Sequence, residues 1–141
     1  MKQKPKKSKS RKPQVVHPTV LCVDDDIDLL KAVASGLEDR NYHVLTASSG
    51  SAAMETLRSA TPDIIIADLR MDPVNGFELY QQIKNVPRNT TIPFFFLTAI
   101  DDPLAKRYSS QLGADAYIIK PVDIDELDQL IMKRLGEKRS S

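Results

Sequence analysis

Reactive side chains in this sequence stand where short apolar runs end. They are Asp24, Asp25 and Asp26 after Thr19–Val23, Asp68 after Ile64–Ala67, Thr98 near the end of Pro93–Ala99, and Lys120 after Ala116–Ile119. Carboxylates held together raise one another's pKa values unless a cation lies among them, and Mg²⁺ suits such oxygen ligands. An aspartate beside Mg²⁺ can attack phosphorus, while a lysine and a hydroxyl hold the new oxygens. These residue types therefore predict a phosphoacceptor site.

The apolar runs predict the strands of a parallel sheet. Ile64–Ala67 is continuously apolar rather than alternating, which is typical of a strand covered on both faces. The other predicted strands are Thr19–Val23, His43–Ala47, Pro93–Ala99 and Ala116–Ile119. Ligands of open α/β sheets bind where the carboxyl ends of the strands meet, so we expect Asp68 to point into that crevice. Taken alone, Asp68 could equally begin a turn or cap a helix.

Helices are predicted between the strands because apolar residues recur there at helical spacing. The predicted helices are Ile27 to about Asp39, Ser51–Ser59, a segment from Gly76 that ends before Pro87, Leu104–Leu112, and a last helix opened by Asp123 with Leu127, Leu130, Ile131 and Leu135 on its inner face. We expect Asp26 to cap the first of these helices and Gly113 to end the fourth. Short connections between alternating strands and helices predict an α/β fold with a doubly wound parallel sheet.

The charge of the chain is divided between its two parts. Seven basic residues and no acid precede Gln14, which leaves 13 basic and 19 acidic residues, a net charge of −6, in the rest of the 141 residues. We expect residues 1–14 to be a disordered basic tail and residues 15–138 to be one folded domain. A basic tail can bind nucleic acid or simply remain solvated, and we do not expect the folded domain to bind nucleic acid.

Composition also excludes several classes of function. The single cysteine, Cys22, excludes an internal disulfide and lies in an apolar run, so we expect it to be buried. No run approaches the ~18 apolar residues that span a bilayer, and we expect a cytoplasmic protein without membrane insertion. His17 and His43 lie away from the reactive loops, so catalysis by histidine is not expected.

The same residues carry a resemblance to a known family. The motifs are Val-Leu-Cys-Val-Asp24-Asp25-Asp, Ala-Asp68-Leu-Arg-Met71 through Gly76, Phe-Leu-Thr98-Ala99 and Tyr117-Ile-Ile-Lys120-Pro121. In this order they resemble a receiver domain of two-component response regulators, similar to the chemotaxis regulators, over about residues 18 to 136. The resemblance implies a flavodoxin-like (βα)5 fold with a five-stranded sheet in the order 2-1-3-4-5.

The resemblance also implies roles for particular residues. Asp68 is the phosphorylated residue; Asp24, Asp25, Asp68 and the backbone carbonyl of Arg70 hold Mg²⁺; Thr98, Ala99 and Lys120 contact the phosphoryl group; Thr98 and Tyr117 form the switch. It further implies a cis peptide before Pro121. The expected phosphoryl donor is a sensor histidine kinase or a histidine phosphotransfer protein. The expected partner of the switched surface is a downstream protein, an output domain or a second copy of the chain. Such a domain is a signalling domain, not an enzyme, although it assists its own Mg²⁺-dependent phosphotransfer and dephosphorylation.

One position departs from the family pattern, and two others bear on the rate of dephosphorylation. Asp72 stands where the family has proline, and Pro73 follows one position later. Asp72 is then either a solvated turn residue or an extra charge near the metal. In receivers the positions two after Asp68 and two after Thr98 line the access route to the phosphoryl group. We hypothesise that Arg70 and Ile100 there hinder an attacking water and slow dephosphorylation.

Other readings of the sequence stay open at this point. An aspartate-nucleophile phosphohydrolase needs a second acid two residues after the nucleophile, where this chain has Arg70. A binding module could keep the fold and act without phosphorylation. The chain could also be the receiver part of a longer response regulator.

Overall fold

The computed structural model describes the backbone of residues 17–140 and the side chains of residues 17–136, so the predicted tail at residues 1–14 lies outside the described residues. The strands are β1 (Thr19–Val23), β2 (His43–Ala47), β3 (Ile64–Ala67), β4 (Phe94–Thr98) and β5 (Ala116–Ile119). They form one parallel sheet in the order β2-β1-β3-β4-β5, which confirms the predicted topology. All carboxyl ends therefore lie at the same edge.

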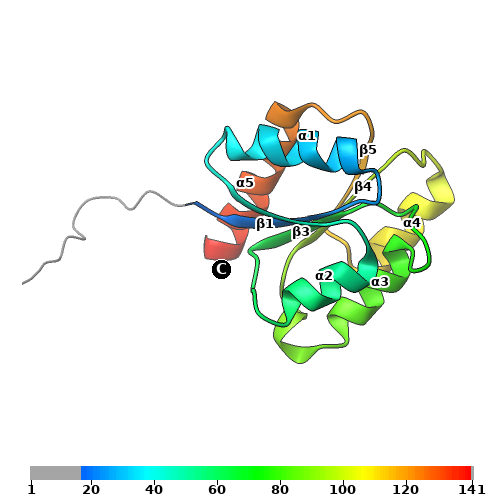
Figure 1. Cartoon of the computed structure of the whole chain (residues 1–141). Coiled ribbons are helices and arrows are strands. Elements are labelled where there is room, and N and C mark those ends of the chain that lie inside the picture. Colours follow the sequence, from blue (N-terminus) through cyan, green and yellow to red (C-terminus); the bar gives the residue numbers. More distant parts are fainter. Residues whose placement is uncertain (1–16, 141) are drawn as a thin grey trace, which may run out of the picture.

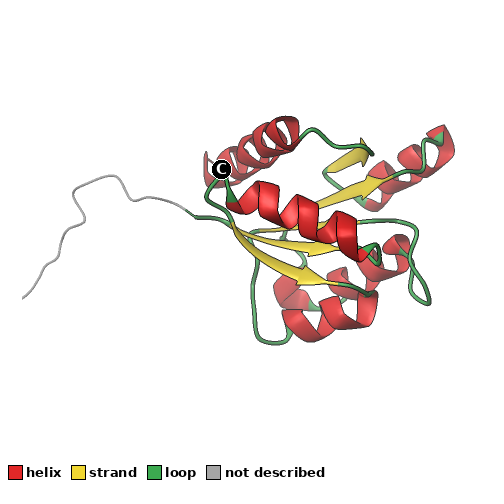
Figure 2. Cartoon of the chain, turned by 45° about the horizontal axis from the view of Figure 1, so that its top comes forward, coloured by secondary structure: helices red, strands yellow, loops and turns green. Residues whose placement is uncertain are grey.

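Helices cover both faces of this sheet (Figures 1 and 2). They are α1 (Ile27–Glu38), α2 (Gly50–Leu57), α3 (Gly76–Lys84), α4 (Pro103–Leu112) and α5 (Ile124–Ser140), with a short 3₁₀ turn, η2, at Pro87–Asn89. Side chains of α1 and α5 pack on one face, and those of α2, α3 and α4 pack on the other. The fold is the doubly wound α/β sandwich that the alternation of elements predicts.

Successive residues of each strand supply the two halves of the core. In β1, Leu21 and Val23 pack toward α2 and α3, whereas Val20 and Cys22 pack toward α1 and α5. The three phenylalanines of β4 (Phe94–Phe96) are almost fully buried, so they are core residues rather than a binding platform. Both faces of the central strands are covered, so β3 is apolar at every position and β1 and β4 each carry a single polar residue, Thr19 and Thr98, at one end.

Capping side chains fix where the helices begin and end. The Asp26 carboxylate accepts a hydrogen bond from the Leu29 backbone N–H at 3.2 Å, as its predicted N-cap role requires. Asp123 accepts one from the Asp125 N–H at 2.8 Å at the start of α5. Gly113 ends α4 with a φ of 111°, the left-handed conformation that favours glycine. Asp26 and Asp123 therefore begin α1 and α5 where the sequence predicts these helices to start.

Some predicted details of the helices are wrong. Leu130, predicted on the inner face of α5, is 39% exposed because Leu127, Ile131 and Leu135 already fill the stripe that meets the sheet. The second helix runs from Gly50 to Leu57 rather than over Ser51–Ser59, because Ser49 caps it through the Ala52 N–H. These differences leave the carboxyl edge of the sheet unchanged.

Candidate functional site

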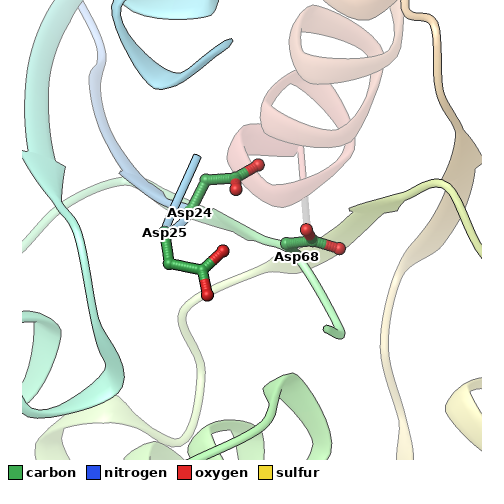
Figure 3. A group of neighbouring side chains, drawn as sticks. All are labelled: Asp24, Asp25 and Asp68. Atoms are coloured by element: carbon green, nitrogen blue, oxygen red, sulfur yellow. The ribbon is translucent and has the colours of Figure 1, made fainter. Parts of the chain in front are cut away.

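Three carboxylates meet at the carboxyl edge of the sheet (Figure 3). Asp24 and Asp25 follow β1, and Asp68 follows β3. One carboxylate oxygen of each lies within 4.8 Å of those of the other two. Asp24 and Asp68 are buried, whereas Asp25 is exposed. Parallel pairing of β1 with β3 produces this meeting, because the Asp68 N–H donates to the Val23 carbonyl at 3.0 Å and keeps the two strand ends level.

Lys120 supplies the cation between the two buried carboxylates. Its Nζ lies 2.8 Å from Asp24 Oδ2 and 3.1 Å from Asp68 Oδ2, and its side chain is only 14% exposed. The peptide bond between Lys120 and Pro121 is cis, as the resemblance implied. Like charges at this distance would otherwise repel strongly, so the ammonium offsets part of that cost.

The electrostatics of the site reflect both burial and this pairing. Burial raises the pKa of Asp24 above its usual range, although the hydrogen bond from Lys120 acts in the opposite direction. Burial alone would lower the pKa of Lys120, but its hydrogen bonds to Asp24 and Asp68 outweigh that effect and raise it. The lysine therefore stays charged across the physiological pH range.

Backbone amides orient the carboxylates. The Asp26 N–H donates to Asp24 Oδ1 at 2.9 Å, and the Arg70 N–H donates to Asp68 Oδ1 at 3.3 Å. On Asp68, one oxygen is thus held by the chain that follows it and the other by Lys120. A carboxylate fixed at both oxygens keeps one orientation, which a nucleophile needs.

The loop after Asp68 is tightly packed, a feature that the sequence analysis did not predict. Leu69 and Met71 are buried, and the Gly76 N–H donates to the Leu69 carbonyl at 2.9 Å. A Cβ on Gly76 would lie 2.3 Å from the backbone oxygen of Asp68, so any side chain there would displace the loop. A glycine eight residues after a candidate nucleophile was the available signal, since close backbone approach is a common reason for glycine.

The altered turn at Asp72 lies outside the carboxylate cluster. Asp72 is exposed, and the peptide bond between Asp72 and Pro73 is cis, which was not predicted. Among the described residues, the carboxylates close enough to share a metal ion are Asp24, Asp25 and Asp68. Asp72 thus fits a solvated turn aspartate rather than a fourth acid at the metal.

Thr98 and Tyr117 are connected through the backbone of Ile100. The fully buried Thr98 accepts a hydrogen bond on Oγ1 from the Ile100 N–H at 3.2 Å. The Tyr117 hydroxyl donates to the Ile100 carbonyl at 2.6 Å. Ala99 lies exposed between Thr98 and Ile100, and the Arg70 side chain is also exposed. The predicted switch pair thus contacts the same residue of the loop that leads to α4.

The donor set fits a small divalent cation. Three carboxylates, two of them buried, are hard oxygen ligands of the kind that Mg²⁺ takes, and exposed Asp25 leaves one side of the cluster open to solvent. No other group of three or more metal-ligating side chains occurs in the part of the chain that the structure describes. Fold and site together define a class of protein: a doubly wound α/β domain with an acidic, lysine-bridged pocket at the carboxyl edge of its sheet.

Comparisons with known proteins identify the family within this class. The sequence model of the response regulator receiver domain matches residues 20–132. Over 130 residues the chain is 32% identical to protein RcaC of Microchaete diplosiphon, covering 92% of this chain and 20% of RcaC. Over 126 residues it is 32% identical to the transcriptional regulatory protein AfsQ1 of Streptomyces coelicolor, covering 88% of this chain and 55% of AfsQ1.

A solved structure agrees with these matches. The chemotaxis response regulator CheY4 of Vibrio cholerae superposes with a TM-score of 0.77 at 29% identity, covering 85% of this chain and 99% of CheY4. The chain belongs to the response regulator receiver domain family and is a receiver domain of the two-component type. This is a signalling family rather than a class of conventional enzymes.

Two general properties follow from membership. Receiver domains bind Mg²⁺ in an acidic pocket, and they interact with histidine kinases and output domains.

The chain spans 20% of the length of RcaC and 55% of that of AfsQ1, so both relatives are longer than this chain. Across the described residues, every helix is too short or too polar to cross a membrane.

Proposed function

We propose that Asp68 accepts a phosphoryl group from a phosphohistidine on a sensor histidine kinase or a histidine phosphotransfer protein. The observation that carries this proposal is the position of Lys120, whose Nζ bridges Asp24 and Asp68 at 2.8 and 3.1 Å. An ammonium held against the buried nucleophile is ready to contact the oxygens that phosphorylation adds.

The transfer step uses the Asp68 carboxylate as nucleophile. One of its oxygens forms a bond to phosphorus while the phosphorus–nitrogen bond of phosphohistidine breaks. The electron pair of the broken bond stays on the imidazole nitrogen, which takes a proton from solvent. The Arg70 N–H holds one Asp68 oxygen and Lys120 approaches the other, so the carboxylate is oriented before the donor arrives.

The metal ligands proposed for this step are Asp24, Asp25, Asp68 and the backbone carbonyl of Arg70. When bound, Mg²⁺ supplies positive charge that neutralises the transferring phosphoryl oxygens. Asp24 is kept in place by the Asp26 N–H, while exposed Asp25 lies on the solvent side. We propose Ala99, through its backbone, together with Thr98 and Lys120 as the phosphoryl contacts.

We propose that the switch acts through the bonds that Thr98 and Tyr117 make to Ile100. Thr98 Oγ1 accepts from the Ile100 N–H, so its own O–H can turn to donate to a phosphoryl oxygen. If the phosphoryl group draws Thr98 Oγ1 toward it, the Ile100 N–H that bonds to this oxygen would shift, and with it the carbonyl that accepts from the Tyr117 hydroxyl. Phosphorylation would then increase the population of a pre-existing active conformation, which differs at the surface formed by α4, β5 and α5.

The setting of the domain is part of the proposal. We infer a cytoplasmic protein whose receiver domain comprises residues 15–138 and whose residues 1–14 form a basic tail. Its surface would meet a downstream protein, an output domain or a second copy of the chain. The longer relatives carry further sequence beyond the matched part. An output domain in a longer form of this protein is therefore also compatible with the proposed function.

Intact mass spectrometry after incubation with Mg²⁺ and acetyl phosphate tests the proposal. We expect one phosphate adduct, lost in Asp68→Ala and after chelation of the metal. Asp72→Ala is the matched control, because Asp72 is an exposed aspartate in the same loop outside the carboxylate cluster. No adduct in the unaltered protein would sink the proposal and favour a binding module that acts without phosphorylation.

The lifetime of the adduct tests the hypothesis about Arg70 and Ile100. Ile100 is a partly buried apolar residue directly after the phosphoryl-contacting loop. Replacing it with glutamate supplies a group that can orient water, and we expect dephosphorylation to accelerate about tenfold, a barrier change of about 1.4 kcal/mol. An unchanged lifetime in Ile100→Glu, with Ile100→Val as control, would count against the hypothesis.

A further inference from the structure

An aromatic side chain of α3 is one of the contacts that hold α4, alongside Ala105 and Leu112 of α4, which pack against the core. The rings of Phe77 in α3 and Tyr108 in α4 meet edge to face, with centroids 4.8 Å apart and planes at 90°. Phe77 also packs edge to face on Phe96 of β4, at 5.3 Å. Leu104 and Tyr108 of α4 remain exposed, and Ser109 is the buried residue of that helix. The Phe77 ring therefore contacts the exposed side of α4 through Tyr108 while its other side packs on the core.

Phe77 is also joined directly to the phosphorylation loop. It follows Gly76, which lies so close to Asp68 that a Cβ on Gly76 would be 2.3 Å from the Asp68 backbone oxygen. The Gly76 N–H further donates to the carbonyl of Leu69, the residue after Asp68. Close-packed groups cannot absorb a shift of a neighbour, so a displacement of the Asp68 backbone would move the start of α3 with it.

We propose that Phe77 is a positioning residue that transmits the state of Asp68 to α4 through Tyr108. This inference rests on the proposed phosphorylation of Asp68. The connection runs from the β3–α3 loop through α3, whereas the Thr98–Ile100–Tyr117 connection runs through the β4–α4 loop. Phosphorylation would thus reach α4 by two routes through different loops, which share one neighbour, the Phe96 ring, at 5.3 Å from Phe77 and 6.4 Å from Tyr117.

Fluorine NMR of protein labelled with 3-fluorotyrosine can follow the two routes separately. The chain has four tyrosines, so Tyr108 and Tyr117 can be assigned by single Tyr→Phe variants. Acetyl phosphate and Mg²⁺ should shift both resonances in the unaltered protein. In Phe77→Leu the edge-to-face contact with Tyr108 is lost, so we expect the phosphorylation-induced change in the Tyr108 chemical shift to fall about threefold or more. The corresponding change at Tyr117 should persist.

Matched variants distinguish transmission from general loosening of the fold. Phe77→Tyr keeps the ring and should restore the Tyr108 response. Tyr80→Phe removes a different α3–α4 contact, the hydrogen bond from the Tyr80 hydroxyl to the Leu112 carbonyl at 3.0 Å, and should leave the response intact. Thermal unfolding of each variant checks that it folds; Phe77→Met replaces Phe77→Leu if the latter does not.

The outcomes separate this inference from the proposed function. Intact mass measured on the same samples reports the adduct independently of any change in α4. An adduct with an unchanged Tyr108 response in Phe77→Leu would overturn the Phe77 route and leave phosphorylation standing. Loss of the Tyr108 response in Tyr117→Ala with Phe77 intact would likewise overturn it, because the whole signal would then pass through Ile100.

Discussion

Helices α4 and α5 both flank the edge strand β5, yet they are attached to the sheet in different ways. Helix α5 buries Leu127, Ile131 and Leu135 in the core that it shares with α1. In α4, by contrast, Leu104 is 71% exposed and Tyr108 is 43% exposed. Burial of aliphatic side chains is the dominant stabilising contribution, so α5 is fixed to the sheet while α4 is held more weakly.

Polar contacts widen the difference. The first half of α5 is joined to residues after α1 by hydrogen bonds from Arg40 to Asp125 at 2.7 Å and from Tyr42 to Asp128 at 2.6 Å. Gly36 of α1 also lets the two helices approach closely, because a Cβ there would lie 2.9 Å from the Ile124 side chain. Between α4 and α3, the hydrogen bond from Tyr80 to the Leu112 carbonyl is the counterpart.

The contrast shows where a signal can be expressed. A helix that opens or shifts at low cost can respond to a local change of charge, whereas a helix fixed by core side chains cannot. The Ile100 backbone and the Phe77 ring both lead to α4 from the loops that carry Thr98 and Asp68. We therefore expect α4 to move on phosphorylation while α5 provides a fixed flank beside it.

The largest effect should come from a matched pair of leucine truncations. Leu127→Ala removes a fully buried side chain of α5 and should lower the free energy of unfolding by about 2–5 kcal/mol. Leu104→Ala removes an exposed side chain of α4 and should change it by no more than about 0.5 kcal/mol. Urea denaturation followed by circular dichroism measures both. A cost above that range at Leu104 would mean that α4 is covered in solution, for example by a second copy.

A second pair compares the tyrosine hydroxyls that hold each helix. Burial and the contact with Asp128 raise the pKa of Tyr42, so it donates as a neutral hydroxyl at pH 7. Tyr42→Phe should cost about 1–2 kcal/mol of global stability, and Tyr80→Phe about 1 kcal/mol confined to α4. Amide hydrogen exchange separates the cases: Tyr80→Phe should lower protection in α4 alone. Equal loss throughout the sheet would place α4 in the same cooperative unit as α5.

Sequence patterns predicted the sheet well because they report burial. Continuous apolar runs such as Ile64–Ala67 define parallel strands covered on both faces, and reactive residues directly after them must meet at one edge. The meeting of Asp24, Asp68 and Lys120 followed from that rule. Their roles in phosphotransfer remain predictions that the experiments above test.

Other features depended on contacts that no local pattern contains. Helical spacing places Leu130 among the apolar positions of α5, but it does not say how wide a stripe the sheet covers, and Leu130 is exposed. The pairing of Tyr42 with Asp128 joins residues 86 positions apart. The packing of Gly76 on the Asp68 backbone depends on the path of the whole loop. Each of these three features is a tertiary property, because it depends on how the helices and strands pack against one another.

The smallest expected effect tests whether α5 is held by its core or by its charges. Arg134 Nε donates to Asp115 Oδ1 at 2.8 Å, while the other oxygen of Asp115 accepts the Phe94 N–H at 2.9 Å. Both side chains are partly exposed, so Arg134→Met should lower the free energy of unfolding by only about 0.5–1 kcal/mol, and added salt should reduce this difference. Denaturation at low and high salt measures it. A loss of stability as large as that of Leu127→Ala would mean that charge pairing, rather than burial, fixes α5 to the sheet. The difference in attachment between α5 and α4 could then not be explained by buried aliphatic side chains.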